Sequence, residues 1–294
     1  MLLKIIEAIE RFTATDYTLI VCDDGSSPEN LLVLSQHNIP LISGDNRGVA
    51  WNKNRGIYYL MECMDCDVVI LIDDDVMPKE VGWEAGWIEA AIKFGHVNYA
   101  FDDMVAENPP HSCSSDVPGL TTKLSGQCIA FSRFSWMYVG YFDPRFGRFG
   151  HEHTEYTNRF LKMGFGGIIL NDNGNKKNFY FVYRGKIKIL DSTSNGSTDE
   201  IAKNQVIYDS INRESDDNSL FRLPWTDKEQ QKSFLNEIFN KLSGSSFNRY
   251  RNVGPIYNEF KPEDYVAINP DVGRSTLSPW EHFFEFGLKE KRSF

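Results

Sequence analysis

Hydrophobic side chains in the first third of the chain alternate between helical and strand-like spacing. Segments with apolar residues on one helical face are expected to be helices, and short continuous apolar runs are expected to be buried strands. The pattern predicts helices at residues 2–12, 45–64 (after an opening turn) and 82–94, and strands at residues 17–27, 41–43 and 66–75. This alternation predicts an α/β fold with a mainly parallel central sheet.

The second half of the chain is more polar. From about residue 171 it becomes rich in Asn, Ser and Asp, most clearly at 191–199 and 212–219, and we expect a mobile excursion there. Residues 227–242 predict an amphipathic helix, and residues 243–246 a linker. We therefore expect two domains, a large one at residues 1–242 and a small helical module at residues 247–294.

Composition narrows the functional classes. No apolar run is long enough to span a bilayer, and no signal peptide pattern opens the chain. A net charge of −10 without a basic block argues against a nucleic-acid partner. The five cysteines form no secreted-type framework and are expected to be reduced thiols in a cytoplasmic protein. We expect Trp83 and Trp87, one helical turn apart, to pack in the core rather than form a sugar platform.

Carboxylates follow two of the predicted strands. Asp73, Asp74 and Asp75 come directly after the most apolar run, and Asp23 and Asp24 end an earlier one. Ligands of α/β sheets bind at the carboxyl ends of the strands, so both loops should face one crevice. Hard oxygen ligands suit Mg²⁺ or Mn²⁺, which would bridge to phosphates. Taken alone, the acidic triplet is also compatible with a solvated turn.

A third group of titratable residues stands at the start of a predicted helix. His151, Glu152 and His153 follow Gly150 within a glycine-rich lead-in. These side chains are compatible with metal ligation, with a general base and its support, or with a capped helix end. The segment alone does not separate these alternatives.

Four sequence blocks resemble the family 2 glycosyltransferases of GT-A fold, in that family's order, across residues 1 to about 170. They read VCDDGSSPEN, NRGVAWNKNRGI, ILIDDDVMP and SGQCIAFSRFSWMYVGYFDPRFGRFGHEHTEYTNRFLKMGF. The resemblance implies a nucleotide-diphosphate sugar donor, a metal-dependent DxD motif and, usually, inversion at the anomeric carbon.

Residue by residue, the resemblance implies a donor site and a metal site. Asp24 would contact the base or ribose with Asp23 beside it, and Lys53 would offset phosphate charge. The implied donor-binding residues are Asp23, Asp24, Asn46, Lys53, Asp73 and Asp74, and the implied metal ligands are Asp73, Asp75 and His151, for Mn²⁺ or Mg²⁺. Gly126 and the stretch through Phe142 and Asp143 match the segment that shapes the sugar and acceptor pocket.

The resemblance also places the catalytic base at this helix start. Glu152 matches the family's usual Glu, whereas His153 stands where the family commonly has Asp. The implied catalytic residues are therefore Glu152 and His153, and the resemblance leaves open which of them is the base.

Two further features bear on the architecture. The family's first strand has no counterpart here, so we expect either that an upstream segment is missing or that the strand has been lost. The tail at residues 264–294 resembles a short module appended to bacterial and viral glycosyltransferases. We expect its His282, which has aromatic neighbours, to be a packed helix residue rather than a ligand.

The sequence as a whole predicts a glycosyltransferase of polysaccharide biosynthesis that moves a sugar from a UDP-sugar to a saccharide acceptor. The alternatives are a nucleotidyltransferase acting on sugar phosphates and a non-catalytic sugar-nucleotide-binding subunit. A dehydrogenase is disfavoured because no strand leads into the G-x-G-x-x-G pattern.

Overall fold

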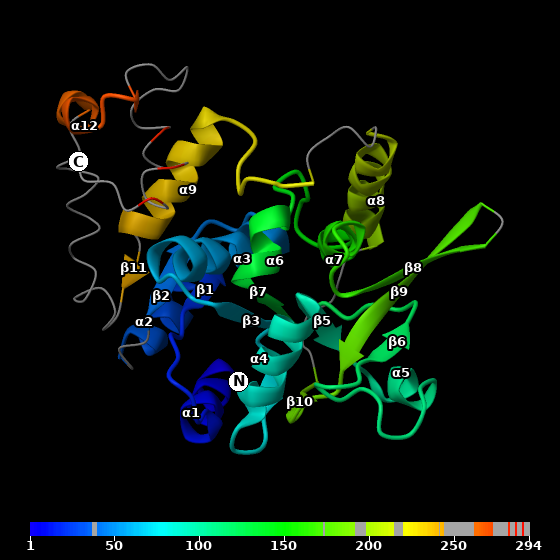
Figure 1. The fold of residues 1–294 in the computed structure, drawn as a ribbon. Helices are drawn as coiled ribbons and strands as arrows, with labels where there is room; N and C mark the ends of the chain where they lie inside the picture. Colours follow the sequence, from blue (N-terminus) through cyan, green and yellow to red (C-terminus); the bar gives the residue numbers. More distant parts are fainter. Residues whose placement is uncertain are drawn as a thin grey trace.

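The computed structural model describes residues 1–36, 40–172, 174–191, 198–214, 220–240, 242–243 and 262–272, together with 282, 286 and 290. Helices cover a set of central strands, and the β8–β9 hairpin extends away from the body (Figure 1). The helices are α1 (Leu2–Phe12), α2 (Pro28–Gln36), α3 (Val49–Tyr58), the π-helical η1 (Tyr59–Cys63), α4 (Trp83–Phe94), α5 (Asp102–Ala106), α6 (Arg133–Val139), α7 (Glu152–Lys162), α8 (Thr198–Arg213), α9 (Lys228–Asn240) and α12 (Pro262–Ile268).

The strands form three groups. β1 (Val21–Asp24) pairs in parallel with β2 (Leu41–Gly44), which β11 (Leu242–Ser243) joins antiparallel. A short antiparallel pair joins β4 (Val76–Pro78) to β10 (Ile187–Ile189). The largest sheet has the order β3-β7-β5-β9-β6, with β8 also on β9. Its strands are β3 (Val68–Ile72), β5 (His96–Tyr99), β6 (Gly119–Thr121), β7 (Cys128–Ser132), β8 (Gly167–Asp172) and β9 (Asn175–Tyr183).

The α/β class is confirmed, and the large sheet is mixed where a mainly parallel one was expected. Only β5 and β9 pair in parallel, whereas β7 runs antiparallel to both β3 and β5. The expectation rested on strand–helix alternation in the first third of the chain, and this alternation holds for β1 and β2. Later strands are joined differently: β8 and β9 form a hairpin, and only antiparallel strands can be joined so tightly.

Much of the polar stretch after residue 171 contains regular structure, so the expected excursion does not extend over residues 175–183, 187–189 and 198–213. β9 pairs with β5, β6 and β8, β10 pairs with β4, and α8 is a sixteen-residue helix. The segments 192–197 and 215–219 lie outside the described residues. The linker expected at 243–246 begins with the last residue of β11, and its other residues are outside the described part of the chain.

Helices α3 and α4 each contribute buried side chains to one of the hydrophobic clusters of the core. Trp83 and Trp87 are 4% and 0% exposed and pack with Val97 and Ala130, so the predicted core role is confirmed.

Most of the tail lies outside the described residues, but His282 is 8% exposed and its Nδ1 lies 3.2 Å from the Tyr265 hydroxyl. It is therefore a packed residue, as predicted. No helix in the described part of the chain is long and apolar enough to cross a membrane.

Candidate functional site

The two carboxylates that end β1 organise their own turn. Asp23 accepts hydrogen bonds from the backbone N–H of Ser26 at 3.1 Å and from the Ser43 hydroxyl at 2.8 Å. Asp24 accepts from the backbone N–H groups of Arg47 at 2.9 Å and Gly48 at 2.8 Å. These bonds hold the β1 turn against the loop after β2. The predicted donor-binding role of both residues remains a prediction beside this structural one.

A cavity of about 490 Å³ lies where β1 and β2 end. It is lined by the backbone turns that Asp23 and Asp24 hold, and Asn46, a predicted donor-binding residue, is among its walls. The lining residues are Gly25, Ser26, Leu31, Ser43, Gly44, Asp45 and Asn46.

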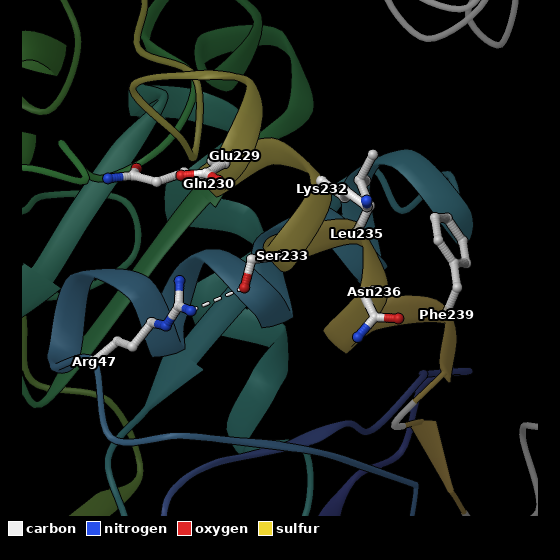
Figure 2. A pocket seen from close by; sticks show the side chains of 8 residues that line it. All are labelled: Arg47, Glu229, Gln230, Lys232, Ser233, Leu235, Asn236 and Phe239. Atoms are coloured by element: carbon white, nitrogen blue, oxygen red, sulfur yellow. Dashed lines mark hydrogen bonds between the residues drawn. The ribbon is translucent and has the colours of Figure 1, made fainter.

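A larger cavity of about 660 Å³ lies along α9, away from the predicted chemistry (Figure 2). Arg47 is the only residue of its lining from the first half of the chain, and its guanidinium donates to the Ser233 hydroxyl at 2.9 Å and stacks over Trp51 at 4.5 Å. Its walls include none of the predicted site residues.

Helix α3 joins the two acidic loops. Arg55, fully buried, donates to the backbone carbonyl of Asp23 at 2.9 Å and to Glu237 on α9 at 2.9 Å. Two residues earlier, Lys53 reaches the other loop, where its ammonium lies 2.6 Å from Oδ1 of Asp73. One helix thus contacts the loops that follow β1 and β3, and the crevice shared by these loops remains a prediction.

Lys53 is the centre of a polar cluster. Besides Asp73, its ammonium donates to the backbone carbonyl of Gly126 at 3.0 Å and lies 3.2 Å from Nε2 of His153. The structure therefore brings Lys53 and Asp73 together with the start of α7. Gly126 is needed for this contact, because a Cβ atom there would lie 2.2 Å from Cδ2 of His153.

The contact with Lys53 assigns the tautomer of His153. An ammonium only donates, so Nε2 of His153 must present its lone pair and Nδ1 must carry the hydrogen. Burial, followed by the nearby Lys53 charge, lowers the pKa of His153 well below its ordinary value. His153 is therefore neutral near pH 7, and its basic nitrogen is already engaged.

The pKa of Glu152 is shifted in the opposite direction to that of His153. It is 2% exposed, and its Oε2 is buried without a hydrogen-bond partner among the described residues. Burial raises its pKa, although backbone hydrogen bonds and Lys53 act in the opposite direction. A buried carboxylate with one free oxygen and a raised pKa has the properties of a general base.

The acidic triplet after β3 is divided among three environments. Asp73 pairs with Lys53 and is about one third exposed, and burial raises its pKa while Lys53 lowers it. Asp74 is exposed. Asp75 is 5% exposed: its Oδ2 accepts from the Gln127 amide at 2.8 Å, and its Oδ1 is buried without a partner among the described residues.

These environments bear on the predicted metal site. Across the described residues, no three His, Cys, Asp or Glu side chains gather closely enough to hold a metal ion. Asp73, Asp75 and His151 therefore do not form a three-ligand site, and the ring of His151 instead stacks on Tyr208 at 5.4 Å. The free Oδ1 of Asp75 still fits one cation ligand, and Mg²⁺ sites commonly use one or two carboxylates with substrate phosphates and water.

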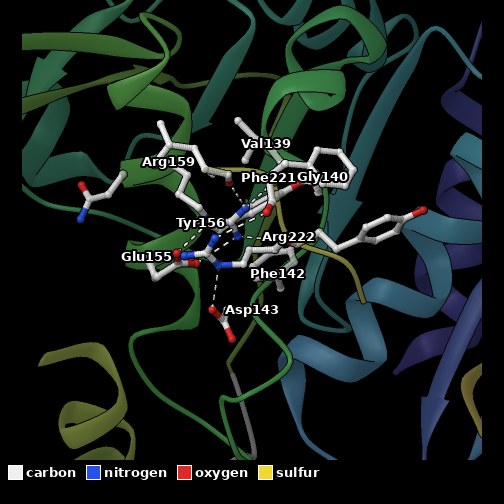
Figure 3. A network of polar contacts seen from close by, with 12 residues as sticks. Val139, Gly140, Phe142, Asp143, Glu155, Tyr156, Arg159, Phe221 and Arg222 are labelled. Atoms are coloured by element: carbon white, nitrogen blue, oxygen red, sulfur yellow. Dashed lines mark hydrogen bonds and ion pairs between the residues drawn. The ribbon is translucent and has the colours of Figure 1, made fainter. Parts of the chain in front are cut away.

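Phe142 and Asp143 do not line a pocket. Phe142 is 0% exposed and stacks on Tyr156 at 4.0 Å, and Asp143 is 1% exposed. Asp143 accepts from Arg222 at 3.1 Å within a network that also contains Arg159 (Figure 3). Both side chains are buried, Phe142 against the ring of His153 at 5.3 Å, and the part of this segment in shaping the sugar pocket remains a prediction.

Sequence reasoning missed four polar residues around the cluster. Arg55 had a local signal, since it lies two positions after Lys53 on the same helix. Gln127, Glu237 and Asn204 carried none, because each owes its role to a partner more than fifty positions away.

Comparison with known proteins gives one family. Residues 1–94 match the model of glycosyl transferase family 2. A solved structure described as GalNAc-T7 with UDP, GalNAc and Mn²⁺ is 12% identical, with a TM-score of 0.48 over 87% of this chain and 55% of that chain. This chain thus spans about half of that protein. No curated protein matches the sequence. The match covers Asp24 at the end of β1, Lys53 on α3 and the acidic triplet that follows β3, so the N-terminal third of the chain is similar to family 2 glycosyltransferases.

Proposed function

We propose that this protein transfers a sugar from a nucleotide-diphosphate donor, with UDP-sugars as the first candidates, to a saccharide acceptor with inversion. The observation that carries the proposal is the cluster of Lys53 and Asp73 at the start of α7, where Glu152 lies. It occurs in a chain whose first 94 residues match family 2 glycosyltransferases. The cluster unites a cation for phosphate charge with a carboxylate suited to remove a proton.

In this reaction an acceptor hydroxyl oxygen attacks the anomeric carbon of the donor sugar. The bond between that carbon and the phosphate oxygen breaks, and the nucleoside diphosphate leaves with the bonding electrons. Glu152 takes the hydroxyl proton, because its Oε2 is free and its raised pKa makes it a stronger base than an exposed glutamate. His153 holds Lys53 in place through Nε2 and is not the base.

Lys53 supplies the positive charge that the leaving diphosphate requires. The cation is held by the Asp73 carboxylate and the Gly126 carbonyl, so it is oriented before the donor binds. Asp75 would be the protein ligand of a divalent ion, Mn²⁺ or Mg²⁺. When bound, such an ion would neutralise the charge of the phosphates.

We expect Asp75→Ala to weaken UDP binding in Mn²⁺ strongly, because the substitution removes the free carboxylate oxygen while leaving the Lys53–Asp73 pair intact. Calorimetry of UDP with Mn²⁺, and again after EDTA, measures the effect, and Glu80→Ala is the matched control because Glu80 is exposed and belongs to none of the predicted sites. UDP binding of equal strength with and without the metal would rule out this ligand assignment.

A donor screen separates this proposal from its alternatives. UDP-, GDP- and dTDP-sugars are incubated with Mn²⁺, and release of the nucleoside diphosphate is followed with and without oligosaccharide acceptors. A glycosyltransferase releases diphosphate and extends the acceptor. A nucleotidyltransferase would release or consume pyrophosphate, and a non-catalytic subunit would bind a donor without turning it over.

The proposal includes a cytoplasmic place in polysaccharide biosynthesis. The five cysteines are all free, which suits a reducing compartment.

We also propose that residues 247–294 form a separate module that serves acceptor engagement or assembly. A chain ending at Ser245 is expected to bind UDP as the full chain does, because every residue of the Lys53 cluster precedes that point. Calorimetry compares the two chains, and a shortened chain that folds but does not bind nucleotide would contradict this division.

A further inference from the structure

Helix α8 lies against the loop that leads into α7 (Figure 1). The loop, taken as residues 147–153, includes Glu152 and His153 at the start of α7 and contains two residues with positive φ, Gly150 at 109° and His151 at 68°. A non-glycine residue rarely adopts positive φ unless its surroundings hold it there. One set of contacts that hold this loop comes from one face of α8, and a second set comes from the start of α3.

Asn204 makes the most direct of these contacts. Its side-chain Oδ1 accepts the backbone N–H of Gly147 at 2.9 Å, and Asn204 is 2% exposed. Its Nδ2 is buried without a partner among the described residues, so this amide keeps its position despite an unsatisfied donor. Ile201, one turn earlier, closes the space beside Gly150, where a Cβ atom would lie 3.2 Å from the Ile201 Cα.

Tyr208, one turn further along α8, holds His151. The two rings stack with centroids 5.4 Å apart and an interplanar angle of 28°. The Tyr208 hydroxyl in turn accepts from the Asn158 amide at 3.0 Å, and Asn158 accepts from the Tyr180 hydroxyl at 2.8 Å. The ring that supports His151 is thereby anchored to α7 and to β9.

The other side of the loop rests on α3. The backbone N–H of Val49 donates to the Arg148 carbonyl at 3.0 Å, and a Cβ atom on Gly48 would lie 2.4 Å from the Gly147 carbonyl oxygen. The loop is therefore clamped between α8 and the N-terminus of the helix that carries Lys53. Movement of α8 away from the loop would release one side of this clamp.

We propose that α8 is the element that positions the 147–153 loop, and that Asn204 and the Tyr208 ring are positioning residues for Glu152. Neither side chain contacts the cluster of Lys53, Asp73 and Glu152 in the described structure, so both act through the loop. The inference rests on the proposed function for its effect on catalysis. The loop contacts themselves can be tested without any activity.

The test compares Asn204→Ala and Tyr208→Leu with Tyr208→Phe and Val206→Ala. Tyr208→Phe keeps the ring and loses only the hydroxyl, and Val206 is 66% exposed on the same helix. Hydrogen exchange of the 147–153 amides and the rate of tryptic cleavage after Arg148 report on the loop. The turnover number and the UDP dissociation constant, measured separately, report on catalysis, and thermal unfolding confirms that each variant is folded.

Asn204→Ala and Tyr208→Leu are expected to speed exchange and cleavage in the loop and to lower turnover about 10- to 100-fold, with UDP affinity unchanged. Val206→Ala should match the original protein, and Tyr208→Phe, which keeps the ring but loses its hydrogen bond to Asn158, should show a smaller effect than Tyr208→Leu. Asn204→Asp, which keeps an oxygen where Oδ1 accepts from Gly147, is expected to restore slow exchange.

Two results would overturn the proposal. Loop exchange that is unchanged in both Asn204→Ala and Tyr208→Leu would show that α8 does not hold the loop. Equal loss in Tyr208→Phe and Tyr208→Leu would assign the effect to the hydroxyl rather than to the ring on His151. An original protein that transfers no sugar would defeat the proposed function, while the exchange measurements would still decide the role of α8.

Discussion

Glu152→Gln is expected to lower sugar transfer by about 10²- to 10⁴-fold, the usual contribution of a general base. Glutamine preserves the shape of the buried side chain and removes only its ability to take a proton, so UDP binding should persist. Transfer rates and calorimetry measure the two effects separately. His153→Ala should weaken transfer less, because Nε2 of His153 is already engaged by Lys53. If both variants keep near-normal rates, the helix start is a cap and the base lies elsewhere.

The pH dependence of sugar transfer follows from the burial of Glu152. Glu152 must be deprotonated to act as a base, and burial raises its pKa. The turnover number should therefore fall as pH is lowered, with its midpoint above the ordinary glutamate value. For stability the sign is opposite: the raised pKa in the folded state disfavours folding as pH rises through it. Glu152→Gln should accordingly raise the melting temperature at neutral pH.

Arg159→Met should produce the largest loss of stability, about 3–5 kcal/mol in the free energy of unfolding, the range for breaking a buried ion pair. Arg159 is 2% exposed and pairs with Glu155 at 2.7 Å. It also donates to the backbone carbonyls of Val139 at 2.5 Å and Tyr141 at 2.6 Å (Figure 3). Methionine fills similar space but leaves the Glu155 charge and both carbonyls without this donor.

Urea unfolding monitored by circular dichroism measures this loss. Lys162→Met is the matched control, because Lys162 is exposed in the last turn of the same helix. Adding Glu155→Gln to Arg159→Met should recover part of the stability, since the double variant buries no unpaired charge. A loss no greater than that of Lys162→Met would contradict the assigned role of the network.

The periodicity of apolar residues was sufficient to predict those helices that bury one face against the rest of the protein. The helix predicted at residues 2–12 is α1, and the predictions at 82–94 and 227–242 agree with α4 and α9 to within one or two residues at either end. The strand predicted at 17–27 is shorter, because only Val21–Asp24 pairs with a neighbour. Apolar periodicity shows which segments seek burial, but partners determine where a strand begins and ends.

The sequence by itself therefore determined the α/β class, the buried tryptophans, and, through resemblance, that Lys53, Asp73 and Glu152 belong to one candidate site. Tertiary structure alone decided the mixed sheet, the regular structure after residue 171, the hydrogen bonds of Asp24 to the Arg47 and Gly48 backbone, and the tautomer of His153. Such features depend on contacts between residues that are far apart in the sequence. Lys53 and His153 are one hundred positions apart, and Gly147 and Asn204 are fifty-seven positions apart. Spacing along a sequence records the periodicity of a single element, whereas these features arise from contacts between elements, which only the folded chain brings together.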